Sequence, residues 1–246
     1  MSKRRQSPLD ALIELIVYTI YAFLYLAFRL IAFVYDLVTF YTSQYKLKSG
    51  NGFFVTLMNK GFYGEFVLYR KLTKKLGKKA VLTNLYLDSK NTETTEIDVL
   101  AVTQKGIYVF EMKNYGGYIY GSQKDQYWTQ AMNRFVKHKF YNPLRQNYAH
   151  IKAVESYLQI ENNQILPLIV FSNRSKLSKI NVGEHDKVFQ FKDALRFVSK
   201  VEKKGNIVFT KEAVVLQLER LIEKSNMPDE VKQKHIEEVK LLQNQA

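Results

Sequence analysis

Two neighbouring apolar runs decide the fold of this chain, Thr95-Glu-Ile-Asp-Val-Leu-Ala-Val-Thr103 and Gly106-Ile-Tyr-Val-Phe-Glu-Met-Lys-Asn114. Both are rich in β-branched and aromatic residues, and only Gln104 and Lys105 separate them. This pattern predicts two antiparallel strands joined by a short turn. Since both faces of each run are apolar, we expect the two strands to lie in the centre of a sheet that is covered on both sides.

Charged side chains interrupt these runs, and three of them concern us here: Asp98 in the first run, and Glu111 and Lys113 in the second. A turn at 104–105 would place Asp98 opposite Glu111, and a turn at 105–106 would place it opposite Lys113; either register puts all three side chains on one face. Charges at the ends of buried strands are costly unless they are paired or bind a cation. The pattern therefore indicates either a divalent metal site beside a scissile phosphate, or a salt bridge of Asp98 with Lys113 that leaves Glu111 solvated.

Hydrophobic periodicity and turn residues predict further elements around these strands. The expected elements are a helix over Gly61–Leu76, a strand over Ala80–Leu87, a hairpin over 115–121, a helix over Pro143–Leu158, a strand over Leu166–Phe171, and helices over Phe191–Ser199, Lys211–Lys224 and Asp229–Asn244. The order helix, strands, helix, strand is typical of an α/β domain in which helices flank a central mixed sheet.

Residues 15–35 contain no charged side chain except Arg29. As a helix they would span about 31 Å, which matches the hydrocarbon core of a bilayer. Apolar residues surround this helix on all sides, a pattern that favours a membrane-spanning helix over a surface-lying one; a buried helix of the soluble domain is the alternative. We expect a single-pass anchor. The basic residues that flank this helix do not decide its orientation. We expect the remaining chain to face the cytoplasm because of the function that we derive below.

The expected organisation has four parts. Residues 1–44 form a tail and membrane anchor, and residues 45–60 form a linker with turn signals at 50–52. Residues 61–200 form the α/β domain, and residues 201–246 form a helical extension.

The formal net charge of +14 favours polyanionic partners, either nucleic acid or an anionic membrane surface. The chain has no cysteine, which excludes disulfides and thiolate zinc sites. Its four histidines lack the spacing of metal ligands, and we interpret them as structural or surface residues. The basic residues that we expect to contact nucleic acid are Lys75, Lys78 and Lys79 at the end of the first helix, and Arg134, Lys137 and Arg145 around the helix that begins at Pro143.

Asp98 followed by Glu111-x-Lys113, with Glu65 on a preceding helix, resembles the PD-(D/E)xK nuclease superfamily. Four ordered blocks resemble more narrowly its nuclease-related domain (NERD) family: Gly61-x-x-Gly64-Glu65, Ile97-Asp98-Val-Leu100, Gly106-Ile-Tyr-Val-Phe-Glu-Met-Lys-Asn-Tyr-x-Gly117 and Asn142-Pro-Leu-Arg-Gln146. The resemblance runs from about Gly61 to Phe171 and implies a restriction-endonuclease-like α/β core. Ile97 stands where the superfamily's name has a proline, and the last 75 residues lie outside the blocks.

The resemblance also implies roles for the site residues. Asp98, Glu111 and Glu65 would hold Mg²⁺ or Mn²⁺ through carboxylate oxygens. Lys113 would orient the attacking water or neutralise charge on the phosphate, and Gln146 would fix the lysine, the water or the phosphate. The alternatives are an exposed first-turn glutamate at position 65 and a polar helix face at position 146.

We therefore expect a membrane-anchored, metal-dependent nuclease with DNA favoured over RNA as its substrate. One alternative is a non-catalytic nucleic-acid-binding or assembly module at the membrane. A third interpretation is a structural membrane protein whose basic face binds anionic lipid. The sequence does not indicate an oligomeric state.

Overall fold

The computed structural model describes residues 7–89, 93–184, 186–225 and 227–244, and the chain forms two compact units, Met1–Thr42 and Ser43–Ala246. The first unit consists of one helix, α1 (Pro8–Thr42), whose most apolar stretch has a mean hydropathy of 2.0. By length and composition α1 is able to cross a membrane. It contains the whole of the span predicted over residues 15–35 and extends beyond both of its ends.

A five-stranded mixed sheet forms the centre of the second unit, in the order β1 (Val81–Asp88), β2 (Thr94–Thr103), β3 (Gly106–Lys113), β7 (Ile165–Phe171) and β9 (Val188–Gln190). The first three strands are antiparallel, whereas β3, β7 and β9 run parallel. Thr103 pairs with Gly106, so the turn lies at 104–105 and the alternative turn one residue later is wrong. The α/β fold with a central mixed sheet is confirmed.

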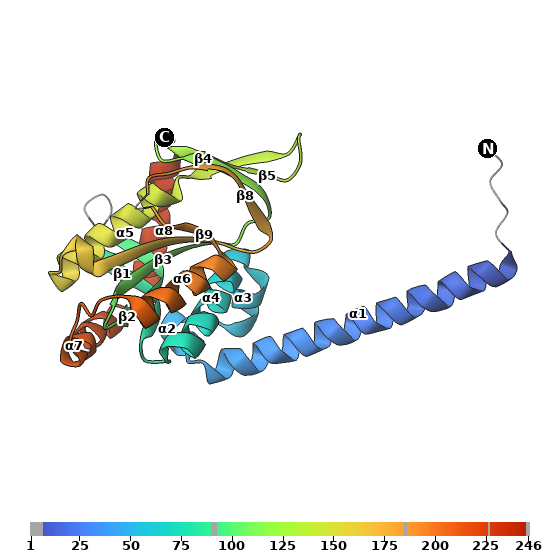
Figure 1. Cartoon of the computed structure of the whole chain (residues 1–246), viewed down its shortest axis with the longest axis horizontal. Helices are drawn as coiled ribbons and strands as arrows, with labels where there is room; N and C mark the ends of the chain where they lie inside the picture. Colours follow the sequence, from blue (N-terminus) through green and yellow to red (C-terminus); the bar gives the residue numbers. More distant parts are fainter. Residues whose placement is uncertain (1–6, 90–92, 185, 226, 245–246) are drawn as a thin grey trace. The chain divides into compact units, whose positions relative to one another are not determined.

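Helices cover both faces of this sheet (Figure 1). On one face, α5 (Pro143–Leu158) and α7 (Lys211–Ile222) contribute Val154, Leu158 and Leu221 to a buried cluster with Leu100 and Val109. On the other face, α4 (Lys60–Leu76) contacts β1, β2, β3 and α6 (Phe191–Lys204). The buried clusters that contain Leu100 and Trp128 both lie within residues 43–246, so this unit has a hydrophobic core of its own.

Capping side chains fix where the two site-bearing helices begin. The Asn59 side chain accepts hydrogen bonds from the backbone N–H groups of Gly61 and Phe62 at 2.8 and 3.2 Å, which starts α4. Asn142 accepts from Leu144 N at 3.0 Å, and Pro143 takes the first position of α5. Both arrangements satisfy backbone donors that have no partner within a helix.

A second, four-stranded sheet has the order β6 (Lys137–Tyr141), β5 (Tyr127–Ala131), β4 (Gly117–Ser122) and β8 (Ser175–Asn181). It packs on the central sheet through Trp128, whose ring is stacked on Phe171 at a centroid distance of 6.2 Å. The hairpin predicted over 115–121 is wrong, because residues 117–122 form one strand that pairs with β5 and β8. Gly117, with φ of 74°, permits the close approach of β4 to β5 at Ala131. A Cβ at position 117 would lie 2.4 Å from Ala131 O.

Two expected segment boundaries differ from the structure. Residues 45–60 contain two short helices, α2 (Tyr45–Ser49) and α3 (Phe53–Met58), and the buried side chains of Tyr45 and Phe53 attach them to the domain in place of the expected linker. The expected boundary at residue 200 falls inside α6. Beyond it, α7 contributes to the core, and η1 (Asn162–Gln164) and α8 (Asp229–Asn244) complete the elements of the described chain.

Candidate active site

The carboxyl end of β3 brings the three predicted charged residues together. Glu111 is only 1% exposed, and its Oε1 lies 2.6 Å from Lys113 Nζ. Asp98 on β2 accepts a hydrogen bond from Met112 N at 2.8 Å through its Oδ2. Lys113 therefore pairs with a buried Glu111, so the alternative of a solvated Glu111 is wrong.

Helix α5 supplies two more polar groups to this cluster. Gln146 Oε1 accepts a hydrogen bond from Lys113 Nζ at 2.9 Å, so Gln146 fixes the lysine and is more than part of a polar helix face. His150 is buried, and its Nδ1 lies 3.4 Å from Glu111 Oε2. His150 is not among the site residues that the sequence predicts. Its spacing of four residues from Gln146 places both side chains on one helix face and is the signal that could have identified it.

Glu65 approaches the cluster from α4. It is 8% exposed, so the alternative of an exposed first-turn glutamate is wrong. Its Oε2 has no hydrogen-bond partner among the described residues. Burial, then the nearby carboxylates of Glu96 and Glu111, raise the pKa of the Glu65 carboxyl to about 8, and Lys113 opposes this rise.

Glu96 is a fourth carboxylate near the site, and it too is absent from the predicted site residues. It lies on β2 two residues before Asp98, and its Oε1 accepts a hydrogen bond from Asn84 Nδ2 at 2.8 Å. Asn84 has a positive φ of 51° within β1. Neighbouring Thr83 donates through Oγ1 to Asp98 O at 2.6 Å. The spacing of two along a strand was the available signal for Glu96.

The electrostatics of the cluster are dominated by negative charge. Burial, then Glu111 and Glu65, raise the pKa of Asp98 well above its ordinary value. Burial lowers the pKa of Lys113, but Glu111, Tyr115 and Asp98 outweigh it, and the net pKa of this ammonium is raised. Burial also lowers the pKa of His150, although the nearby Glu111 carboxylate opposes this shift. One lysine therefore faces several carboxylates.

The donor set fits a divalent cation in its chemistry. Oε2 of Glu65 and Oε2 of Glu111 are buried carboxylate oxygens that lack hydrogen-bond partners in the described part of the chain. Such hard oxygen ligands suit Mg²⁺ or Mn²⁺, and a cation would relieve the repulsion that raises the pKa values of Asp98 and Glu65. As the side chains stand, no group of three or more His, Cys, Asp or Glu among the described residues is arranged to hold a metal. Binding would require these side chains to draw together.

The basic residues expected to contact nucleic acid fall into two groups. Lys75, Lys78 and Lys79 lie at the far end of α4, where Lys75 Nζ bonds Ser199 Oγ; ten residues of helix put Lys75 about 15 Å from Glu65. The second group lies closer in sequence to site residues. Arg145 directly precedes Gln146, and Arg134 and Lys137 belong to the β5–β6 connection and β6.

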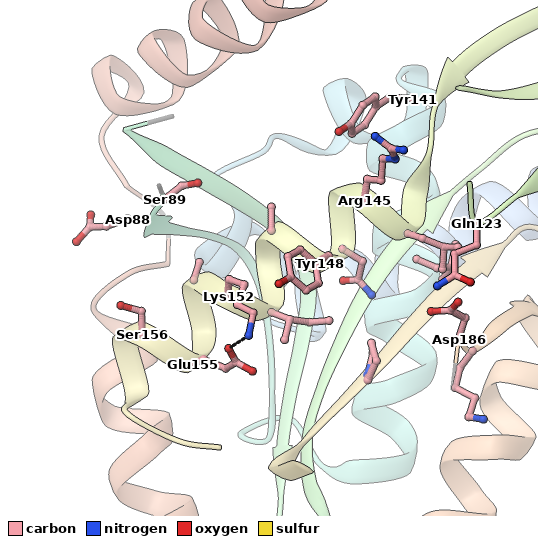
Figure 2. Close-up of a pocket in the computed structure, with 18 residues that line it drawn as sticks. Asp88, Ser89, Gln123, Tyr141, Arg145, Tyr148, Lys152, Glu155, Ser156 and Asp186 are labelled. Atoms are coloured by element: carbon pink, nitrogen blue, oxygen red, sulfur yellow. Dashed lines mark hydrogen bonds and ion pairs between the residues drawn. The ribbon is translucent and has the colours of Figure 1, made fainter. Parts of the chain in front are cut away.

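A groove of about 1120 Å³ runs along α5 and is lined by residues of this helix and of β7, among them Ile151 and Ile169 (Figure 2). Its lining carries both signs of charge, and Lys152 is paired with Glu155 at 2.6 Å. The residues that line it include Arg145 but none of the three charged residues at the end of β3.

Comparison with known proteins identifies the family. The model of the nuclease-related domain matches residues 60–172. An uncharacterised protein of Bacillus anthracis is 34% identical over 182 residues, which cover 72% of this chain and 82% of that protein. The chain belongs to the nuclease-related domain family. Its nuclease-related domain begins with α4, ends just after β7 and contains all five predicted site residues.

One solved structure is also similar to this chain. It is the crystal structure of a protein of unknown function, whose sequence is 17% identical to this chain. The alignment covers 76% of this chain and 100% of that protein's chain, with a TM-score of 0.34.

Proposed function

We propose that this protein hydrolyses phosphodiester bonds of nucleic acid in a reaction that depends on Mg²⁺ or Mn²⁺. The observation that carries the proposal is the buried Glu111–Lys113 pair at the end of β3, with Gln146 on the lysine and two further carboxylates beside it. Buried charges of this kind are costly to a fold, and perturbed pKa values cluster at functional sites. Membership of the nuclease-related domain family supports the same function.

Each side chain has a role that follows from its contacts. Asp98, Glu111 and Glu65 would hold the cation, which when bound polarises a phosphoryl oxygen and lowers the pKa of the attacking water. Lys113 is fixed by Glu111 and Gln146, and its raised pKa keeps it protonated. It therefore neutralises charge that develops on the phosphate and does not act as a base. His150 Nδ1 lies 3.4 Å from Glu111 Oε2 and lines the site beside this carboxylate.

We further propose that α1 anchors the enzyme in a membrane with its nuclease-related domain in the cytoplasm, where both Mg²⁺ and nucleic acid are present. The length and apolar composition of α1 support the anchor. The orientation and the preference for DNA over RNA are expectations that the cleavage experiment and a topology assay would test.

A non-catalytic nucleic-acid-binding or assembly module at the membrane is the second candidate. One observation favours it: the carboxylates of the described residues are not gathered around a common point as a group of three metal ligands. Such a module would bind nucleic acid without cleaving it.

The experiment is a cleavage assay on residues 43–246 with single- and double-stranded DNA and RNA, in Mg²⁺, Mn²⁺ or EDTA. The variants are Lys113→Ala and Asp98→Ala, and the control is Lys192→Ala, an exposed lysine on α6. We expect cleavage that requires metal, persists in the control and disappears in both site variants. Salt-dependent binding without cleavage, unchanged by the site variants, would support the second candidate.

A further inference from the structure

The outer face of the second sheet is basic and carries tyrosines. Strand pairing aligns Lys137, Ala131, Tyr118 and Lys176 in one row across β6, β5, β4 and β8. A second row aligns Lys139, Thr129, Tyr120 and Lys179. Side chains of directly paired residues point to the same side of a sheet. The outer face is therefore defined by Tyr118, Tyr120, Lys137, Lys139, Lys176 and Lys179.

Burial of the alternate residues confirms which face is outside. Ile119, Trp128, Phe140 and Leu177 belong to the cluster that packs on the central sheet. Tyr118 is 44% exposed, and Lys176 Nζ lies 5.8 Å from the centre of its ring. The four lysines of the outer face are all exposed, and the four strands, every residue of which is described, contain no Asp or Glu.

The loop that joins β5 to β6 extends this surface with a rigid tip. Phe135 is 78% exposed, and the Arg134 guanidinium lies 4.5 Å from the centre of its ring. Asn133 Oδ1 accepts hydrogen bonds from Phe135 N and Val136 N, both at 2.8 Å, and Met132 N donates to Val136 O at 2.9 Å. These bonds fix the loop, so Phe135 is displayed to solvent in a preformed conformation.

The outer face begins beside the candidate active site. β4 starts at Gly117, four residues after Lys113. Arg174, which directly precedes β8, donates through Nη2 to Asn114 O at 2.7 Å. A Cβ on Gly116 would meet the Met132 side chain at 3.9 Å, so the loop after β5 also lies close to this segment. The outer face and the end of β3 are therefore neighbours in the structure.

We propose that the outer face of the second sheet binds single-stranded nucleic acid, with bases stacked on Tyr118 and Phe135 and phosphates held by the surrounding lysines. This inference rests on the proposed function, for which it names the form of the substrate. Aromatic rings take up bases that are not already stacked in a duplex, and lysines interleaved with them follow the backbone. Tyr118 and Tyr141 are the exposed large apolar side chains of the four strands, and Met132, Phe135 and Val136 are those of the loop.

The test is the affinity of residues 43–246 for a fluorescent single-stranded oligonucleotide and for the same sequence as a duplex, measured by anisotropy in EDTA. The variants are Tyr118→Ala, Tyr118→Phe and the pair Lys176→Ala/Lys179→Ala. The control pair Lys203→Ala/Lys204→Ala removes two exposed lysines from the end of α6. Far-ultraviolet circular dichroism and a thermal melt establish that each variant is folded.

We expect the single strand to bind more tightly than the duplex. Tyr118→Ala should raise the dissociation constant about tenfold. Tyr118→Phe should leave the dissociation constant at its wild-type value, because this variant keeps the ring that stacks. The lysine pair should lower the slope of log affinity against log salt by about 1.4, since each phosphate contact of a single strand contributes about 0.7. The control pair should leave both quantities unchanged.

The proposal is overturned if the duplex binds more tightly, or if the outer-face variants bind the single strand as well as the control does. A parallel arm measures sedimentation with phosphatidylserine vesicles; if the outer-face variants lose vesicle binding and keep single-strand binding, the face is a membrane surface and the proposal fails. Because EDTA removes any metal-dependent cleavage, the outcome does not depend on whether the protein is a nuclease. If the protein cleaves nucleic acid and the outer-face variants bind the single strand as the wild type does, this inference fails and the proposed nuclease function stands.

Discussion

The central sheet and the second sheet differ in where they carry charged side chains. In β2 and β3 both faces are buried from Val99 to Val102 and from Ile107 to Phe110, and Glu111 follows directly. In the second sheet one face packs on the core, and the other carries the exposed lysines of β6 and β8. A buried carboxylate lowers stability unless it is compensated, whereas an exposed lysine costs almost nothing. Charge therefore points to chemistry at the central sheet and to a polyanionic partner at the second sheet.

The largest expected effect is a loss of nucleic-acid cleavage when Lys113, at the end of β3 in the central sheet, is replaced. Lys113→Ala removes the ammonium that Glu111 and Gln146 fix and that the proposed function assigns to the phosphate, and we expect the single-turnover cleavage rate to fall on the order of 10²–10³-fold. Tyr120→Phe, on the second sheet, should change the rate less than threefold. A Lys113→Ala protein that cleaves at the wild-type rate would remove the distinction between the two sheets.

The central sheet should also carry most of the stability. Leu100 is fully buried among residues of β3, α5 and α7, and Leu100→Ala should lower the free energy of unfolding by about 2–5 kcal/mol. The measurement is urea denaturation of residues 43–246 followed by circular dichroism. A loss below about 1 kcal/mol would mean that this core is not closely packed.

The buried carboxylates predict an unusual pH dependence. The pKa of Glu65 rises from its ordinary 4.5 to about 8 in the folded protein, so between these pH values the folded state keeps a proton that the unfolded state has lost. The free energy of unfolding should therefore fall as pH rises from 5 to 8, on the order of 2 kcal/mol, and Glu65→Gln should reduce this slope. Denaturation at pH 5.5 and pH 8 checks the sign. Stability that rises with pH in the wild type and not in the variant would contradict it.

The smallest effect on stability is expected at the second sheet. Tyr118 is partly exposed, and Tyr118→Ala should change the free energy of unfolding by no more than about 0.5 kcal/mol while it weakens single-strand binding. Denaturation and anisotropy on one preparation separate the two quantities. A large loss of stability would show that this side chain is part of the core.

Much of the central sheet could be predicted because two long apolar runs separated by a short turn favour adjacent antiparallel strands. The sequence left two turn positions open, of which the structure has 104–105, and Pro143 marks the observed start of α5. Lys113, Glu111 and Gln146 could be selected because charged or amide side chains are conspicuous beside apolar runs or in a family motif. Their contacts at 2.6 and 2.9 Å were not predictable, since they depend on how α5 crosses β3.

The remaining features depend on tertiary contacts that no local pattern records. Helices α2 and α3 have five and six residues, too few to show a helical period, and their buried Tyr45 and Phe53 lie beside glycines that indicate a linker. His150 resembles any histidine of a helix until Glu111 is placed 3.4 Å away. The place of β8 in the second sheet could not be predicted, because it pairs with β4 across a long stretch of sequence.

The most direct test of the central claim is one variant, Asp98→Asn, measured for cleavage and for stability in the same preparation at pH 8. The amide keeps an oxygen to accept the hydrogen bond from Met112 N and removes one charge from a site where carboxylates repel one another. We predict that cleavage falls at least a hundredfold, while the free energy of unfolding stays equal or increases. A variant that unfolds more easily and still cleaves nucleic acid would contradict the account, because the charges would then serve the fold and not the reaction.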